Sequence, residues 1–593
     1  MVFGIYLILS IALFWDTIHS PYNNWVGDIG DPNTFMWNLY WIPYALIHGH
    51  NPLFSNYLMY PKGINLLWNT SIIFPAIILT PITFAFGPIF SFNFLTVLAL
   101  PISASVAYLA IRRYCKSRIS AFIGALLYGF SPYMLAQSLG HPNLTLVWYP
   151  PFVLLISDLF LKQKIKRKTF SIALGVGSLI QLLTSEEILI TTAISAIVLL
   201  VILKIFLSNY FNKERLQEIF IAIFAGAVIA FILSLYFLYF QFFGPQRIKG
   251  PIQASALYVT DLLNLVVPTQ FQFIFPSWAH YIAFHFSGNG SEWTGYIGAP
   301  LLFVAIIVIS RQWSDPKIKI PAIFALIMCL LSMGPQLHIE GFVTSVYLPW
   351  ELVKNLPIID NILPDRLMNF VFLSLAFLIA VVIDKVLKSK NWKKISFSFG
   401  VLIICFIPLL PVYPYPNQPS VVPVFFRTNL VKMIPKKSVA LIAPYSSSYL
   451  PSLWQAEANF RFKMPEGGVL APNKSGTVVT GAQQPQQIYT ALEEIQTNYP
   501  LMKLSPSSIS RIQKRLQKDS VQTVIVGPFG SPESPLPKNI SSSILNTPSP
   551  RLSIQQAQTI ELFTVILGKK PHYLGGIYIW SNVKNLLAQS MNR

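Results

Sequence analysis

Residues 23–71 read NNWVGDIGDPNTFMWNLYWIPYALIHGHNPLFSNYLMYPKGINLLWNTS and separate two strongly apolar stretches of the chain. The segment is rich in aromatic residues, contains a single lysine and carries the acidic motif GDIGDP near its start. Asp31 followed by Pro32 is typical of a helix start, with the aspartate as N-cap and the proline at the first helical position. We therefore expect residues 32–47 to form an aromatic helix that lies at a membrane interface, where Trp and Tyr are enriched.

The apolar stretches on either side of this segment continue along most of the chain. Of the 593 residues, 53% are hydrophobic and 11% are charged, whereas a soluble domain carries about 25% charged residues. Runs of the roughly 20 apolar residues needed to cross a bilayer recur as far as residue 412. They do not alternate in polarity as barrel strands do. The sequence therefore predicts a polytopic α-helical membrane protein.

Basic residues gather in short loops between the apolar runs and account for much of the formal net charge of +20. In a soluble protein this charge would indicate nucleic-acid binding. In a membrane protein, short basic loops face the cytoplasm and anionic lipid. The sequence thus predicts contact with membrane lipids and no nucleic-acid partner. The loops lie at residues 112–118, 162–168, 204–215, 311–319 and 385–394.

This charge pattern predicts about eleven transmembrane helices in the plasma membrane, with a cytoplasmic N-terminus and the C-terminus outside. Residues 72–86 are apolar, but counting them as a crossing would place the cluster at 112–118 outside. Because they are short and contain Pro75 and Pro81, we expect an interfacial or re-entrant segment there. The spans are expected at residues 2–15, 91–111, 119–138, 144–161, 169–184, 188–207, 219–243, 297–310, 320–334, 370–387 and 395–412.

The composition changes after residue 412, where proline and serine become frequent and apolar runs shorten to strand length. We expect a transmembrane domain over residues 1–412, with a long first outer loop at 16–68, and an extracytoplasmic soluble α/β domain over 413–593. Within the latter, the patterns predict strands at 438–445, 521–527, 560–567 and 575–580, helices at 486–499 and 507–517, and a loop at 531–550.

The features of the membrane part follow a distinctive order. After the first span come the outer loop with GDIGDP, an aromatic helix and a proline-broken segment that runs into AFGPIFSFNFLT (85–96). The basic IRRYCKSR (111–118) and a span ending in GFSPYMLAQ (129–137) follow. Over about 410 residues this order resembles the GT-C class of membrane glycosyltransferases. The resemblance implies a GT-C-like fold, a polyprenyl-phosphate-linked sugar donor, and a first-loop aspartate at or beside the catalytic base.

Asp28 and Asp31 are the candidates for that base, which removes a proton from the acceptor hydroxyl. Asp31 is favoured because it directly precedes the aromatic helix, although capping alone would also explain it. Asp28 has no capping role, but exposed loop carboxylates are common. The resemblance implies an inverting hexosyl- or pentosyltransferase whose acceptor on the outer face is a cell-wall glycan, a glycolipid or a protein. A divalent metal at these acids is left open, since some members of the class use one and others do not.

Other polar residues on the predicted outer side are candidates for substrate binding. Ionisable groups near the membrane are costly and often functional, an arginine suits a lipid phosphate, and a tryptophan can stack on a sugar. Each also has a structural explanation, such as an exposed turn, an acid that reaches water, an interface anchor, or an ion pair of Arg366 with Asp365 or Asp360. The candidates are His141, Glu186, Glu187, Glu292, Trp293 and Arg366.

Two other functions remain open. A transporter or flippase of a lipid-linked intermediate would tend to show inverted repeats and charges at the bilayer midplane, whereas here the acids gather at one face. A non-catalytic membrane assembly factor is the other alternative. It predicts that Asp28, Asp31 and Glu186 can each be replaced by the amide without loss of function.

Overall fold

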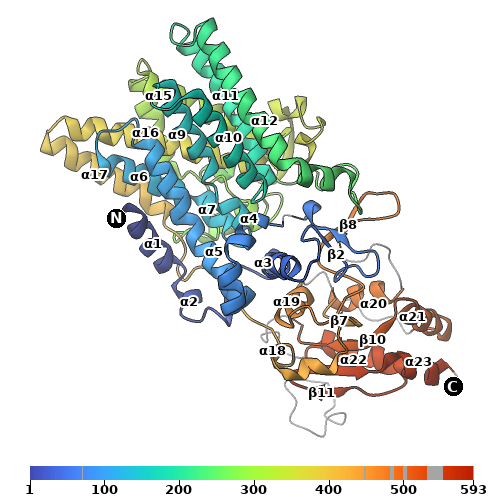
Figure 1. The fold of residues 1–593 in the computed structure, drawn as a ribbon. Coiled ribbons are helices and arrows are strands. Elements are labelled where there is room, and N and C mark those ends of the chain that lie inside the picture. The colour runs from blue at the N-terminus through green and yellow to red at the C-terminus, as the bar shows by residue number, and fades with distance from the viewer. Residues whose placement is uncertain are drawn as a thin grey trace. The chain divides into compact units, whose positions relative to one another are not determined.

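The computed structural model describes residues 1–69, 71–254, 256–445, 449–480, 487–497, 504–529 and 552–591. The chain forms two compact units, whose elements are labelled in Figure 1. Unit 1 consists of residues 1–20, 93–236 and 251–417, and unit 2 of residues 21–92, 237–250 and 418–593. Unit 2 therefore combines most of the predicted first outer loop with the C-terminal part of the chain. The predicted loop at 531–550 lies outside the described residues.

Unit 1 is helical. Its helices are α1 (Val2–Leu13), α2 (Trp15–Ile18), the later part of α5 (Thr80–Ile111), α6 (Arg118–Gly129), α7 (Pro132–Gln137), α8 (Pro142–Thr145), α9 (Tyr149–Leu161), α10 (Arg167–Leu182), α11 (Glu186–Phe206), most of α12 (Lys213–Phe243), α13 (Ser277–Ala283), α14 (Ala299–Arg311), α15 (Pro316–Ser332), α16 (Met368–Lys388) and α17 (Trp392–Phe406). A hairpin of β4 (Gln336–Ile339) and β5 (Phe342–Tyr347) interrupts them.

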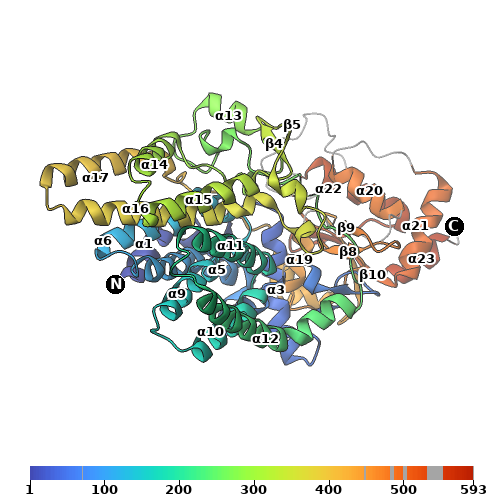
Figure 2. The same cartoon turned by 90° about the horizontal axis from the view of Figure 1, so that it is seen from above.

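The centre of unit 1 is α16, which packs against α6 and α15 (Figure 2). A Cβ added to Gly124 of α6 would lie 2.5 Å from the carbonyl oxygen of Ala376 and 2.9 Å from the Cβ of Ala380. Small residues on both helices thus allow their backbones to approach closely, as is common between membrane helices.

In the described part of the chain, seven helices are long and apolar enough to cross a membrane. They lie at residues 80–111, 118–137, 142–161, 186–206, 213–243, 364–388 and 392–409. The remaining predicted spans coincide with the shorter helices α1, α10, α14 and α15. Every predicted span therefore falls on a helix, while the number of crossings and their direction stay predictions.

The apolar residues 72–86 form α4 (Ile73–Ile78) and the beginning of α5. Gly87 then adopts φ 86° and ψ 172°, which is not helical and breaks α5. Glycine adopts positive φ without steric cost, and Pro88 after it cannot donate a helical hydrogen bond. The break separates residues 80–86 from the predicted span at 91–111.

In unit 2, the aromatic helix predicted at 32–47 is α3 (Asp31–Ile47). Gly30, and not Asp31, is the N-cap residue. Trp37 and Trp41 are each 1% exposed, and the indole N–H of Trp37 donates to Oε1 of Gln455 at 2.8 Å. The helix packs against α19 (Leu450–Glu457), so these two rings are buried within unit 2 and are not presented to lipid. The position of α3 at a membrane interface stays a prediction.

The C-terminal part of unit 2 contains a four-stranded sheet in the order β11-β12-β10-β7 (Figure 1). Strand β10 pairs in parallel with β7 and antiparallel with β12. The strands are β7 (Val439–Ala443), β10 (Val521–Val526), β11 (His572–Leu574) and β12 (Ile577–Ser581), and the helices around them are α20 (Gln487–Gln496), α21 (Pro506–Lys518), α22 (Ile554–Leu567) and α23 (Val583–Met591). The remaining elements are β1 (Asn24–Val26), β2 (Phe54–Ser55), β3 (Ile64–Asn65), β6 (Asn417–Pro419), α18 (Val424–Arg427), β8 (Leu470–Pro472) and β9 (Val478–Thr480).

The predicted strands at 438–445 and 521–527 contain β7 and β10, and the one at 575–580 overlaps β12, but the strand predicted at 560–567 is wrong. That segment belongs to α22. Ser553 caps the start of this helix by accepting from the N–H of Gln556, and Gly568 with φ 64° ends it. A short apolar run does not by itself distinguish a strand from a buried helix, and the caps on either side decide for the helix.

Short 3-10 helices complete the structure. They are η1 (Leu66–Trp68), η2 (Leu263–Leu265), η3 (Gly290–Glu292), η4 (Pro349–Leu352), η5 (Ile359–Asn361), η6 (Pro364–Leu367), η7 (Ile407–Leu409) and η8 (Asn429–Met433). Two of them, η3 and η6, carry charged residues of the candidate site in unit 1.

Candidate functional site

The acidic motif of unit 2 holds two exposed carboxylates, Asp28 and Asp31. Gly27 (φ 105°) and Gly30 (φ 143°) give the backbone a course that other residues rarely adopt. Trp25 is fully buried, and its indole N–H donates to the carbonyl oxygen of Asp28 at 2.8 Å. The motif is therefore a loop shaped by glycines and anchored by a buried ring, with both acids accessible.

The first turn of α3 connects this loop to the rest of unit 2. Asp31 and Pro32 occupy that turn, and Thr34 donates its hydroxyl to the carbonyl oxygen of Gly468 at 3.3 Å. Asn33 is fully buried, and among the described residues neither atom of its side-chain amide has a hydrogen-bond partner. A helix start with a buried, unsatisfied amide thus lies directly after the two carboxylates.

A second polar site lies in unit 1, around Arg366 of η6. Its Nη2 donates to Oε1 of Glu292 at 2.7 Å and its Nε to Oε2 at 3.3 Å, while its Nη1 pairs with Glu187. The side chains of Arg366, Glu292 and Glu187 are 14%, 3% and 17% exposed. One arginine therefore connects η6, η3 and the first turn of α11 in a largely desolvated setting.

Two further side chains extend this arrangement, which we call the Arg366 network. Gln137 donates its amide N–H to Oε2 of Glu292 at 2.7 Å, and its Oε1 lies 2.8 Å from Nδ1 of His141. This fixes the orientation of the amide, because its nitrogen must face the carboxylate. The same Nδ1 lies 4.0 Å from Oε1 of Glu292, and the backbone N–H of Leu363 donates to Glu187 at 2.9 Å.

Asp365 and Tyr133 lie next to the network and are both fully buried. Within the described residues, the two carboxyl oxygens of Asp365 have no hydrogen-bond partner, and the hydroxyl of Tyr133 has none either. The backbone carbonyl oxygen of Asp365 in η6 accepts a hydrogen bond from the hydroxyl of Thr294 at 3.1 Å. This bond connects η6 to the residues that follow η3.

The electrostatics of the network centre on Glu292. Burial raises its pKa, but the Arg366 guanidinium and then His141 lower it by more, so the pKa of this carboxyl lies well below its usual range. Glu292 is therefore ionised at neutral pH. Burial, and then the charge of Glu292, raise the pKa of Asp365 well above its usual range, so this carboxyl is neutral. The guanidinium of Arg366 already pairs with Glu187 and Glu292, and these acids disfavour an added phosphate.

The network contains four of the predicted site residues: His141, Glu187, Glu292 and Arg366. Arg366 does form ion pairs, but with Glu187 and Glu292, whereas the sequence suggested Asp365 or Asp360. Gln137 and Tyr133 were not singled out, although both belong to the quoted GFSPYMLAQ motif. Their only signal in the sequence is polarity inside an otherwise apolar run.

Glu186 and Trp293 have different surroundings. Glu186 is half-buried in the first turn of α11. Trp293 is buried, donates its indole N–H to the carbonyl of Ser287 at 3.2 Å and meets Phe284 and Phe286 at ring-centroid distances of 5.7 and 6.1 Å. The ring belongs to a small apolar cluster, which does not favour the expectation that it stacks on a sugar.

The donor groups do not form an evident metal centre. Across the residues that the structure describes, no group of three or more His, Cys, Asp or Glu side chains is arranged to hold a metal ion.

Comparison with solved structures defines the class of fold. The cryo-EM structure of the arabinofuranosyltransferase AftD from Mycobacteria matches 98% of this chain and 39% of its own, with 13% identity and a TM-score of 0.56. A mutant of that protein matches 89% of this chain and 37% of its own, with 14% identity and a TM-score of 0.51. A weaker likeness, with a TM-score of 0.46 and 11% identity, is to apo ArnT from Cupriavidus metallidurans, with 98% of both chains covered.

The fold is that of the GT-C membrane glycosyltransferases, as the order of sequence features predicts, and the chain is a multi-pass membrane protein. It spans about two fifths of the length of the AftD chain. The model of a family described as "Domain of unknown function (DUF6311)" matches residues 2–359, and the chain belongs to this family. No curated protein matches it.

Proposed function

We propose that this protein is a membrane glycosyltransferase that moves a sugar from a polyprenyl-phosphate-linked donor to an acceptor hydroxyl. The acceptor is a cell-wall glycan, a glycolipid or a protein on the outer face of the plasma membrane. What carries the proposal is the GT-C fold combined with two exposed carboxylates in the GDIGDP loop. The similar AftD structure is an arabinofuranosyltransferase, so a pentosyl or hexosyl donor is the first to test.

In this proposal Asp31 is the catalytic base and Asp28 is the alternative. The carboxylate takes the proton of the acceptor hydroxyl as the oxygen attacks the anomeric carbon. The bond between that carbon and the phosphate oxygen breaks, and polyprenyl phosphate leaves with the electron pair. Attack from the face opposite the leaving group inverts the anomeric configuration. An exposed acid suits this role, because the base must reach an incoming acceptor.

The proposed topology places this loop on the outer side, with about eleven spans and the C-terminal residues 413–593 also outside. We assign the Arg366 network a different role from the base. Because its one guanidinium is already paired with Glu187 and Glu292, a phosphate ligand is disfavoured, and we infer that the network holds η3, η6 and the start of α11 together within unit 1. Glu186 and His141 remain candidates for contact with sugar hydroxyls.

The test is sugar transfer by the purified protein in lipid nanodiscs, from a panel of polyprenyl-phosphate-linked pentoses and hexoses. Because a general base contributes about 10²- to 10⁴-fold, Asp31→Asn or Asp28→Asn should reduce the rate by that factor. Asp16→Asn, a carboxylate-to-amide change in α2 outside the motif, should leave the rate unchanged.

Equal transfer by both loop variants and the wild type would refute the assignment of the base. Movement of an intact donor across sealed vesicles without transfer would instead support the flippase alternative.

A further inference from the structure

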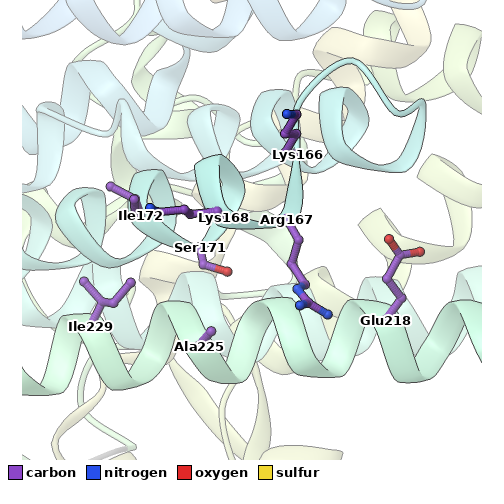
Figure 3. A pocket seen from close by; sticks show the side chains of 8 residues that line it. All are labelled: Lys166, Arg167, Lys168, Ser171, Ile172, Glu218, Ala225 and Ile229. Carbon is purple, nitrogen blue, oxygen red and sulfur yellow. The ribbon is translucent and has the colours of Figure 1, made fainter.

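A groove of about 530 Å³ lies along the contact between α10 and α12 in unit 1 (Figure 3). Ser171 on α10 donates its hydroxyl to the carbonyl oxygen of Ala222 at 2.8 Å. One turn further on, a Cβ on Gly175 would lie 2.9 Å from the carbonyl oxygen of Gly226. The two backbones therefore touch along this line, and the small residues Ser171 and Ala225 leave space beside it.

The entrance to the groove is basic. Lys166, Arg167 and Lys168 lie at the start of α10 and are exposed, and Glu218 of α12 is the one acidic residue in the lining. Figure 3 shows Arg167 extending toward α12, with Glu218 at the same end of the groove. In the described part of the chain, none of these cations has a salt-bridge partner.

The position of these cations is unfavourable without an anion. The N-terminus of a helix carries partial positive charge and unpaired N–H groups, so acidic residues are favoured there and basic ones are not. Helix α10 has 16 residues, no acid in its first turn and no side-chain cap at Lys166. An anionic ligand would satisfy the free N–H groups and offset the repulsion among the three cations.

The rest of the groove is apolar. Ala225 and Ile229 of α12 and Ile172 of α10 line it, and Ile172 is 44% exposed. Helix α12 is long and apolar enough to cross a membrane, so this wall continues into a region of lipid contact. Free phosphate would use only the basic end, whereas an amphipathic anion would use both.

We propose that this groove binds one anionic glycerophospholipid, with its phosphate at Arg167 and the start of α10 and an acyl chain along Ala225 and Ile229. Three cations against one carboxylate favour an anionic head group over a zwitterionic one. The site lies on a basic loop predicted to be cytoplasmic, where anionic lipid is attracted to such clusters. It is separate from the proposed sugar transfer and can be tested without it.

The experiment is native mass spectrometry of the full chain in detergent, with phosphatidylglycerol or phosphatidylcholine added. Wild type should retain one phosphatidylglycerol per chain in clear preference to phosphatidylcholine. The double variant Arg167→Gln, Lys168→Gln should lower this retention about 10- to 30-fold, as expected for the loss of two cations near a lipid surface. The matched control is Lys393→Gln, Lys394→Gln, which removes two exposed cations from the first turn of α17.

A second variant, Ala225→Phe, fills the groove and leaves every charge in place. It should also reduce retention if the acyl chain occupies the groove, while excess inorganic phosphate should not displace the lipid. Each of five results would overturn the proposal. Two concern the lipid: equal retention of phosphatidylcholine, or preferential retention of a polyprenyl phosphate. The others are equal loss in the α17 control, undiminished binding by Ala225→Phe, and displacement of the lipid by inorganic phosphate.

Discussion

Replacing Arg366 by methionine tests how much the Arg366 network stabilises unit 1. The change removes the cation but keeps an unbranched side chain of similar length. It leaves the Glu292 carboxyl group, whose side chain is 3% exposed, without the two N–H donors that now contact its oxygens, so this group must either keep an uncompensated charge or take up a proton. Glu187 loses its ion pair as well. Breaking a buried pair in this way costs about 3–5 kcal/mol in the free energy of unfolding.

The same reasoning gives an internal check through a double-mutant cycle. Once Arg366 is absent, Glu292→Gln replaces the stranded carboxyl group by a neutral amide, so the second substitution should recover part of the loss. We expect an interaction energy of at least about 2 kcal/mol between the two positions, since close charged pairs are strongly coupled. Arg366→Lys should be intermediate, because an ammonium group keeps the charge but cannot bridge both glutamates with a planar fork.

The measurement is unfolding in SDS, followed by the reaction of a thiol dye with Cys115 and Cys405, which are buried in the folded protein. Arg427→Met is the matched control. Arg427 also pairs with both oxygens of one carboxylate, Glu457, at 3.1 and 3.2 Å, but its side chain is 31% exposed. Its loss should cost less than about 1 kcal/mol. A cost for Arg366→Met no larger than that of Arg427→Met, or a cycle without coupling, would refute the reasoning.

Two further predictions concern stability. Burial raises the pKa of Glu466 in the folded protein well above its usual range. At pH values between the unfolded pKa of about 4.3 and this folded pKa, unfolding therefore releases a proton. The free energy of unfolding should fall as the pH rises through this window. Thermal unfolding at pH 5–9 should show that the decrease of stability with pH is weaker in Glu466→Gln and unchanged in Glu561→Gln, which alters an exposed acid. An identical pH dependence in both variants would contradict the assignment of this decrease to Glu466. Gly175→Ala should destabilise by about 1–3 kcal/mol through overpacking, because its Cβ would lie 2.5 Å from Ile229. Gly400→Ala, with open space around it, should be neutral or stabilising by up to about 1 kcal/mol. Equal effects of the two alanine substitutions on the free energy of unfolding would argue against the close contact of α10 and α12 at Gly175.

The helices of the membrane part could be predicted because hydropathy is a local property. Each predicted span overlaps one or two helices, and the non-helical Gly87 lies between the apolar segment 72–86 and the span at 91–111. Breaks inside spans were harder to foresee. The span predicted at 119–138 is divided into α6 and α7, since Ser131 caps the second helix and Pro132 begins it. Serine and proline here act through backbone geometry, which a count of apolar residues does not detect.

The candidate site could be predicted in part. The ionisable residues that face one another in unit 1 were found because charges are rare in apolar segments. Gln137 and Tyr133, the neutral polar residues beside them, were not found, and Asp365 was considered only as a neighbour of Arg366 in sequence. The two acids of GDIGDP were found from the order of features, but Asp31 was assigned a capping role that belongs to Gly30.

The sequence by itself determined that this is a helical membrane protein, where its helices lie and which loops are basic, because transfer of apolar residues into lipid and the distribution of charge depend on composition along short segments. Only the tertiary structure decided the partners. Arg366 meets glutamates 74 and 179 residues away, and Trp37 bonds to a glutamine 418 residues away. Which polar groups become buried together depends on how distant segments pack, and local patterns carry no record of that packing.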